Sequence, residues 1–167
     1  MDLVGLYPWI VFLHIAGAFV FVLAHGVSAF VSDQIRKERN VDRIRALLDV
    51  SRSSIAMAYG GLITLLVSGI VAGIVGNHFS RGWIWVSLGL LIAIMVAMYA
   101  LAARYYAQVR TAVGLPSYTD KKGVAPPPPA SPEELDRLLR TSRPDVIGGI
   151  GFFGLLLILA LMVFKPF

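Results

Sequence analysis

Two histidines stand inside a long uncharged segment of this 167-residue chain. The segment, FLHIAGAFVFVLAHGVSAF, covers residues 12–30 and holds His14 and His25. An imidazole is a common metal ligand, and it is costly in hydrocarbon unless its nitrogens find partners. The chemistry open to this pair is therefore ligation of a cofactor or metal, proton conduction, or hydrogen bonding between helices.

The spacing of the pair limits these possibilities. The histidines are 11 residues apart, which puts them on one face of a helix, about 20° apart around the axis and about 16.5 Å apart along it. One haem cannot take both, because the axial positions of a single iron are far closer together than that. Each histidine needs its own partner from another helix.

Two methionines and one further histidine could supply such partners. Met57 and Met98 are predicted at about the depth of His25, and a His/Met pair could bind haem b or, as a soft-ligand site, copper. His78 falls at the outer interface and would have to reach inward to meet His14. The predicted cofactor-binding residues are thus His14 and His25, and the predicted metal ligands are His14, His25, Met57 and Met98.

A simpler interpretation needs no cofactor. Each imidazole could instead bond to another helix, for example to Ser68, Thr64 or Ser87, or to a carbonyl freed by a nearby glycine.

The elements that hold these side chains are predicted to be membrane spans. Hydrophobic residues make up 57% of the chain and charged residues 15%, against about 25% charged in an ordinary soluble domain. Four uncharged stretches approach the roughly 20 residues that a spanning helix needs. We predict an all-α, polytopic bundle of four transmembrane helices in a single membrane domain, with spans at about 8–32, 53–76, 82–104 and 146–165 and loops at 33–52 and 105–145.

The distribution of basic residues predicts the orientation. Of the 15 lysines and arginines, 12 lie in the two long loops and Arg104 lies at the edge of one of them, which makes 13 on one side. Only Arg81 and Lys165 lie on the opposite side. Because positive loops stay inside, both long loops are expected in the cytoplasm and both termini outside it. The net charge of +5 is then a topology signal, so no nucleic-acid partner is expected.

Reporter fusions test this orientation. A reporter fused after Phe167 is expected to be active outside the cytoplasm, and one inserted near Gly123 to be active inside. The reverse pattern would contradict the model.

Small residues predict how the spans pack, because they let backbones approach where lipid offers no hydrophobic drive. The second span carries them at every fourth position, and the third does so more weakly, so their small faces are expected to meet across the turn at 77–81. Gly60→Leu is then expected to lower thermal stability more than Leu62→Ala does. The stripe of the second span is Ala56, Gly60, Thr64, Ser68, Ala72 and Gly76, with a GxxxG at Gly69 and Gly73 beside it.

The loops carry local signals of their own. An amphipathic segment around 41–48 is expected on the membrane surface or as an extension of the first span. Pro126 to Pro129 form an extended spacer. Ser131 is predicted to cap a short helix that begins at Pro132 and has Glu134 as its third residue, and Asp145 is predicted to cap the fourth span.

Several classes of chemistry are excluded by composition. The chain has no cysteine, which removes disulfides, thiolate nucleophiles and iron–sulfur clusters. No Asp or Glu lies inside a span to act as a base or zinc ligand. We therefore expect that the protein is not an enzyme by itself.

The pattern LHIAGAFVFVLAHG, an Arg-rich loop, a Gly-rich second span and SLGLLIAIMVAMYALAARYY together resemble an uncharacterised four-helix integral-membrane family related to the copper resistance D family. The resemblance covers roughly residues 8–110. It implies a multi-pass protein of the plasma membrane, the bacterial inner membrane, with a copper or haem connection through His14.

Two functions follow as expectations. In the first, intramembrane histidine binds haem or copper in a redox or copper-handling setting. In the second, the protein is an accessory or structural membrane subunit without cofactor, whose partner is another membrane protein or a second copy of the chain in the lipid bilayer.

Overall fold

The computed structural model describes residues 5–117 and 127–167, and these residues form helices and no strand. The main helices are α1 (Tyr7–Lys37), α2 (Val41–Val75), α3 (Gly82–Met98), α4 (Arg104–Ala112), α5 (Pro132–Leu139) and α6 (Arg143–Phe164). A short 3-10 turn, η1 (His78–Ser80), precedes α3, and a π-helical segment, η2 (Tyr99–Ala103), joins α3 to α4.

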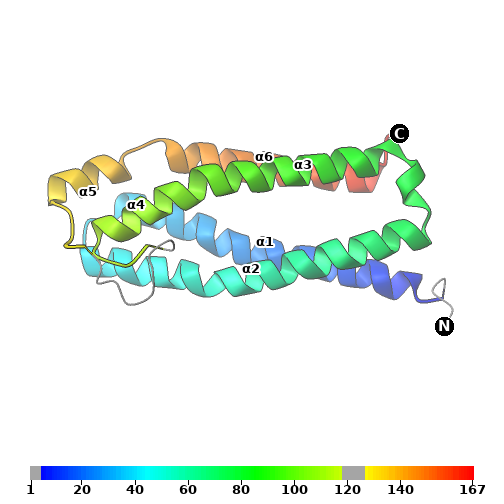
Figure 1. Ribbon diagram of the computed structural model, residues 1–167, viewed down its shortest axis with the longest axis horizontal. Coiled ribbons are helices and arrows are strands. Elements are labelled where there is room, and N and C mark those ends of the chain that lie inside the picture. Colours follow the sequence, from blue (N-terminus) through cyan, green and yellow to red (C-terminus); the bar gives the residue numbers. More distant parts are fainter. Residues whose placement is uncertain (1–4, 118–126) are drawn as a thin grey trace.

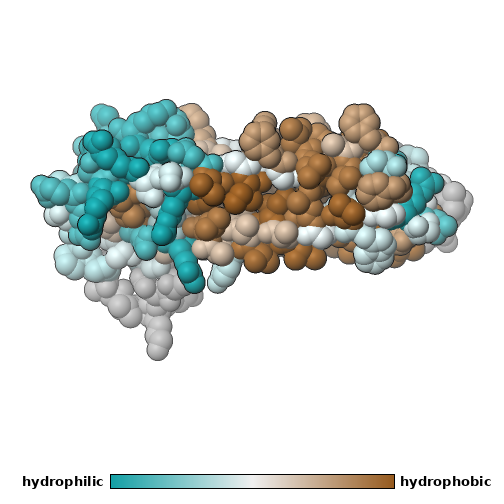
Figure 2. All heavy atoms as spheres, turned by 90° about the horizontal axis from the view of Figure 1, so that it is seen from above, coloured by the Kyte–Doolittle hydropathy of each residue, from teal (hydrophilic) through white to brown (hydrophobic). Residues whose placement is uncertain are grey.

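Four helical stretches are long and apolar enough to cross a membrane, which confirms the predicted all-α, four-helix membrane fold. They run over Tyr7–Lys37, Val41–Val75, Gly82–Ala112 and Pro132–Phe164. A wide apolar band covers the middle of the surface, and hydrophilic side chains gather mainly at one end (Figure 2). Such a band matches the hydrocarbon core of a bilayer, where the side chains that face lipid are predominantly apolar.

The helices form two pairs, α1 with α2 and α3 with α6 (Figure 1). Both chain ends lie at one end of the bundle, here called the termini end. The connections α1–α2 and α4–α5–α6 lie at the other end, here called the basic end. This arrangement is the one that four spans with two long loops on one side demand.

The predicted pairing of the second and third spans is wrong, because α2 packs along α1. The closest approach lies where Gly17 of α1 meets Gly61 of α2. A Cβ at Gly61 would stand 2.6 Å from the backbone nitrogen of Phe21, and a Cβ at Gly17 would stand 2.7 Å from that of Leu65. Only glycine lets two backbones come this close.

The first half of the predicted small-residue stripe is misplaced by one residue, whereas Ser68 in its second half is buried. Gly60 and Thr64 are exposed, and nothing lies within 4 Å of a Cβ built at Gly60. The neighbouring Gly61 and Leu62 are buried instead. One residue turns a helix by about 100°, so the expected order of Gly60→Leu and Leu62→Ala reverses.

The amphipathic segment 41–48 forms the opening turns of α2, so it leads into the second span and does not extend the first. Its Ile44 and Leu48 join a buried cluster at the basic end. This basic-end cluster draws on α1, α2, α4, α5 and α6 and consists of Val31, Ile35, Ile44, Leu48, Tyr105, Val109, Val113, Leu135, Leu139 and Ile147. A cluster of this size forms at the water-facing end because burial there removes apolar surface from water, a gain that lipid does not provide.

The signals in the second loop had mixed outcomes. Ser131 caps α5 as predicted, since its hydroxyl accepts the Glu134 backbone N–H at 3.2 Å. Asp145 is not the cap of the fourth span, because α6 begins at Arg143, and the carboxylate of Asp145 pairs with Arg36 instead. Pro126, Lys121, Lys122 and Gly123 lie outside the described residues.

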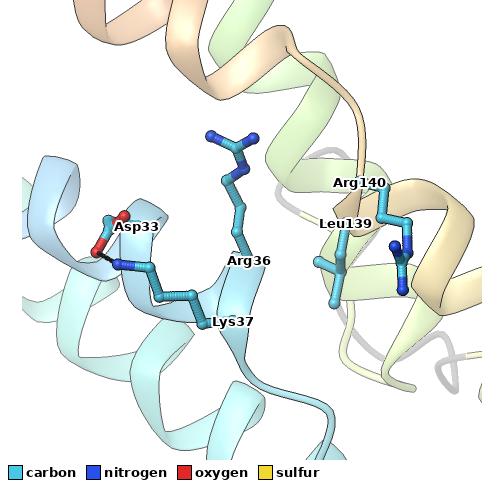
Figure 3. A pocket seen from close by; sticks show the side chains of 5 residues that line it. All are labelled: Asp33, Arg36, Lys37, Leu139 and Arg140. Carbon is cyan, nitrogen blue, oxygen red and sulfur yellow. Dashed lines mark hydrogen bonds and ion pairs between the residues drawn. The ribbon is translucent and has the colours of Figure 1, made fainter.

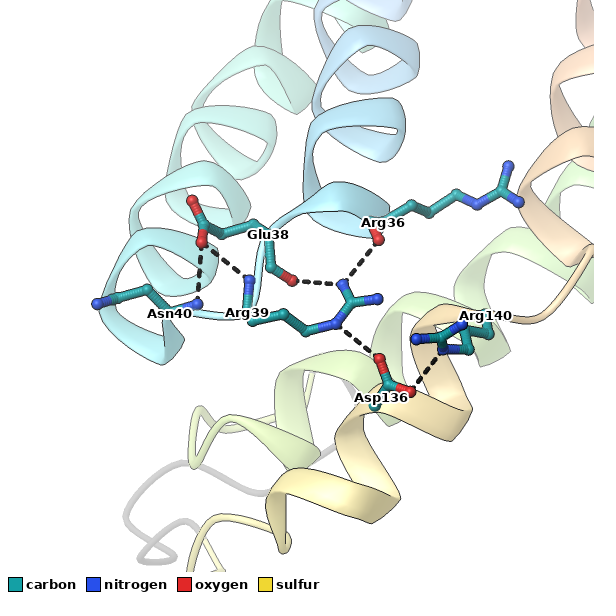
Figure 4. Close-up of polar contacts among 6 residues, drawn as sticks. All are labelled: Arg36, Glu38, Arg39, Asn40, Asp136 and Arg140. Atoms are coloured by element: carbon teal, nitrogen blue, oxygen red, sulfur yellow. Dashed lines mark hydrogen bonds and ion pairs between the residues drawn. The ribbon is translucent and has the colours of Figure 1, made fainter.

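Polar contacts tie the helix pairs together at the basic end (Figure 4). Arg36 of α1 pairs with Asp145 of α6. Arg39, in the α1–α2 connection, donates through Nε to Asp136 of α5 at 2.7 Å, and Arg140 donates to the other oxygen of the same carboxylate at 2.6 Å. These contacts link α6 to α1, and α5 to the connection between α1 and α2.

Candidate functional site

His14 is held by the neighbouring helix through one of its two ring nitrogens. Its Nδ1 lies 2.8 Å from the carbonyl oxygen of Leu65 on α2. A carbonyl can only accept, so Nδ1 carries the proton and Nε2 keeps its lone pair. In the neutral ring this leaves one donor directed at α2 and, at Nε2, one acceptor or ligand atom without a hydrogen-bond partner among the described residues.

Gly69 provides the room for this ring. A Cβ built at Gly69 would lie 2.7 Å from Cε1, 2.8 Å from Nδ1 and 3.9 Å from Nε2 of His14. The nitrogen that keeps its lone pair is thus the one farther from α2. Any side chain at position 69 would push the imidazole out of its present orientation.

The three side chains expected to bond to a histidine in the cofactor-free interpretation, Ser68, Thr64 and Ser87, do not bond to His14. The Ser68 hydroxyl donates to the Thr64 carbonyl and, at 3.3 Å, to the same Leu65 carbonyl that His14 uses. The Ser87 hydroxyl donates to the Trp83 carbonyl at 2.8 Å. His14 bonds instead to a backbone carbonyl, that of Leu65 within the continuous helix α2. The expectation that a nearby glycine frees such a carbonyl stays a prediction.

His25 has a different environment. Its ring stacks on Phe21, with centroids 5.8 Å apart and an interplanar angle of 18°. Its Nε2 lies 3.4 Å from where a Cβ of Gly151 on α6 would stand. Among the described residues His25 makes no hydrogen bond, so its nitrogens are not oriented as those of His14 are.

The two methionines are not bonded to His25. Met57 is 48% exposed on the outside of the bundle, and Met98 packs against the basic-end cluster. Within the described ranges, neither sulfur is a hydrogen-bond partner of His25. The same residues contain no group of three or more His, Asp or Glu side chains able to hold a metal ion.

His78 does not reach inward to His14, and it bonds to Tyr7 at the termini end. The Tyr7 hydroxyl lies 3.0 Å from His78 Nε2. The ring also lies against Trp83, with centroids 5.7 Å apart, and its Nδ1 is buried without a partner among the described residues. Tyr7 stands two helical turns before His14, about 10.5 Å along α1, so His78 and His14 mark two separate contacts between α1 and the α2–α3 hairpin.

The environment of His78 predicts how stability depends on pH. Burial, and then the charges of Lys165 and Arg81, lower the pKa of His78. The folded protein therefore favours the neutral ring, and the unfolded chain binds more protons below the ordinary histidine pKa of about 6.5. The free energy of unfolding is expected to hold above that pH, to fall as the pH drops from there toward the lowered pKa of the folded state, and to level off below it. The pH dependence of unfolding in detergent measures this effect.

His78→Gln is the matched variant, because its amide can still bond to Tyr7 but does not titrate. It is expected to show a shallower loss of stability on acidification than the parent protein. Identical slopes in the two proteins would assign the acid sensitivity to other groups.

Three features of the site were not predicted as functional: the Leu65 carbonyl, Gly69 and Tyr7. Gly69 was visible in the sequence as part of a GxxxG motif, whereas Tyr7 was visible only as an aromatic residue near the start of the first uncharged segment. No sequence signal marks one backbone carbonyl among many.

The comparisons with known proteins agree with this architecture. The model of the family described as "Predicted integral membrane protein (DUF2269)" matches residues 8–166. No curated protein and no solved structure matches the chain. The predicted membership of an uncharacterised four-helix integral-membrane family is confirmed, and the relation to the copper resistance D family stays a prediction.

Proposed function

Because the chain belongs to this integral-membrane family, DUF2269, we propose that its function is carried out inside the bilayer, where His14 binds a redox cofactor, haem b or copper. When bound, either group would supply one-electron transfer. The protein is then a cofactor-holding membrane component and not an enzyme by itself.

The hydrogen bond between His14 Nδ1 and the Leu65 carbonyl is the observation that carries this proposal. A ligating histidine almost always donates its other ring N–H to a carboxylate, carbonyl or water, which fixes the tautomer and the orientation of the ring. In the protein alone, His14 already donates its Nδ1–H to the Leu65 carbonyl. His25, which lacks such a bond, is the weaker candidate.

Haem is favoured over copper by the number of donors. Four ligands of a haem iron come from the porphyrin, so a single oriented imidazole can anchor it. A Cu(I) site would need further soft ligands beside the histidine. In the part of the chain that the structure describes, no cluster of three His, Asp or Glu side chains is present, so haem b through His14 is the leading candidate.

Copper stays as the second candidate for the inner part of the bundle. His25 has no competing hydrogen bond among the described residues, and Met57 or Met98 would have to turn toward it. A pair of this kind could also serve haem as His/Met axial ligands.

The alternative is an accessory or structural subunit without cofactor. The same hydrogen bond supports it, because a His14–Leu65 contact joins α1 to α2 whether or not Nε2 has a ligand. Its partners would be another membrane protein or a second copy of the chain, in the plasma membrane of a bacterium.

Spectroscopy of the purified protein separates these proposals. With bound haem, the detergent-solubilised protein is expected to show a Soret band and one iron per chain. With bound copper, the absorbance spectrum is expected to lack a Soret band and elemental analysis to find copper. A colourless, metal-free and stable preparation, unchanged after incubation with hemin or Cu(I), would favour the accessory subunit.

A further inference from the structure

A cavity at the basic end lies between α1 and α5. It has a volume of ≈ 570 Å³ and is lined by Asp33, Arg36, Lys37, Leu139 and Arg140. The Arg36 and Arg140 side chains come from different helices on either side of it, while Lys37 turns toward Asp33 (Figure 3). None of these residues belongs to the histidine site.

The cavity sits where the apolar band ends. Residues 3–32 carry no charge, and the lining residues of α1 follow directly, between Asp33 and its last residue Lys37. The uncharged part of α1, residues 7–32, is about 39 Å long, which exceeds the roughly 30 Å of the hydrocarbon core. When this part is centred in the bilayer, the lining residues that follow it lie at the depth of the lipid headgroups. Leu139 gives the cavity one apolar wall.

The lining carries an excess of positive charge. Three cations, Arg36, Lys37 and Arg140, face one carboxylate, Asp33. Outside the lining, Asp145 pairs with Arg36, and Asp136 is shared between Arg140 and Arg39. Four cations, Arg39 included, thus meet three carboxylates, which leaves one positive charge uncompensated among these residues.

The existing ion pairs are easily exchanged. Lys37 and Asp33 pair at 2.6 Å with side chains 67% and 52% exposed, and the Arg140 side chain is 71% exposed. Arg36 is 30% exposed and its partner Asp145 is 63% exposed, so a phosphate at Arg36 would compete with a half-exposed carboxylate. Exposed pairs contribute only about 0–1 kcal/mol. A phosphate group accepts charge-assisted and bidentate hydrogen bonds from arginine that are stronger than these.

We propose that this cavity binds the phosphate of an anionic phospholipid headgroup. Arg36 and Arg140 hold the phosphate from two helices, Lys37 adds a third positive charge, and Leu139 contacts the apolar part of the lipid that follows the headgroup. Basic pockets between spanning segments at this depth suit such lipids. The headgroup links α1 to α5 and so closes the basic end, independently of any cofactor.

The test compares lipids and variants in detergent solution. The thermal unfolding midpoint is measured while phosphatidylglycerol, phosphatidylcholine or inorganic phosphate is added. Phosphatidylglycerol is expected to raise the midpoint of the parent protein, whereas phosphatidylcholine and inorganic phosphate are expected to leave it unchanged.

Two double variants with equal loss of charge locate the site. Lys37→Gln/Arg140→Gln alters the cavity, and Arg52→Gln/Arg104→Gln removes two exposed arginines elsewhere near the same membrane boundary. The first is expected to need at least about tenfold more phosphatidylglycerol for half the rise, which corresponds to about 1.4 kcal/mol. The second is expected to respond as the parent does.

Three results would overturn the proposal. Phosphatidylglycerol would have no effect on the parent protein, or both double variants would lose the response equally, or inorganic phosphate would produce the same rise as the lipid. The last result would assign the cavity to a soluble phosphate compound. Because the response is a concentration shift, a lower starting midpoint of a variant does not obscure it.

Discussion

Gly61→Ala is expected to destabilise the bundle strongly, lowering the free energy of unfolding by about 3 kcal/mol. The new Cβ would stand 2.6 Å from the backbone nitrogen of Phe21 and 3.0 Å from the Gly17 carbonyl oxygen. Both are backbone atoms, so no side chain can turn away, and α1 and α2 must separate along their contact. Reversible unfolding of the detergent-solubilised protein with a denaturing detergent measures the loss.

Gly60→Ala is the matched control, one residue away in the same helix. A Cβ there meets nothing within 4 Å, and alanine is a better helix former than glycine by about 1 kcal/mol. This variant is expected to be as stable as the parent or slightly more stable. Equal losses in the two variants would mean that α1 and α2 do not meet at Gly61.

The comparison also shows why sequence predicted the spans and not their partners. A span is a local property, because it needs only enough consecutive apolar residues to cross the bilayer. A helix partner depends on which face is small, and α2 has adjacent glycines at 60 and 61 that point about 100° apart. Choosing between them requires the opposing surface of α1, where Gly17 makes the complementary gap.

The same distinction separates the correct cap from the incorrect one. Ser131, Pro132 and Glu134 form a capping signal that is complete within four residues, and the structure contains it. Asp145 has the right type for a cap after Pro144, but α6 begins earlier and Arg36 takes the carboxylate. Arg36 lies 109 residues away in the chain, so no local pattern could indicate this pairing.

The histidines show how much of the candidate site could be predicted from the sequence. Their shared face and their need for partners from other helices could be predicted, because residue type and helical period determine both. The partner of His14 is a backbone carbonyl, which every residue has, and the orientation of the ring depends on the space above Gly69. Only a three-dimensional arrangement could identify this pair.

The second large effect is expected at His14. His14→Ala and His14→Gln are both expected to abolish bound haem or copper, because neither side chain offers the lone pair of an imidazole nitrogen to a metal. His25→Gln is expected to retain part of the cofactor, since no hydrogen bond orients His25 among the described residues. Cofactor per chain is measured by absorbance and elemental analysis after purification in the same detergent.

The glutamine variant separates a ligand from a structural group. The amide of glutamine can still donate a hydrogen bond to the Leu65 carbonyl. His14→Gln is therefore expected to unfold at nearly the same temperature as the cofactor-free parent protein, while His14→Ala also loses the contact between the helices.

Gly69→Ala offers a further check, because His14 remains but its ring is displaced by a Cβ that would lie 2.7 Å from Cε1. It is expected to lower cofactor content where Gly60→Ala does not. If the His14 variants keep a full complement of cofactor, or if the parent protein binds none, His14 is an interhelical hydrogen-bonding group and the protein is the accessory subunit.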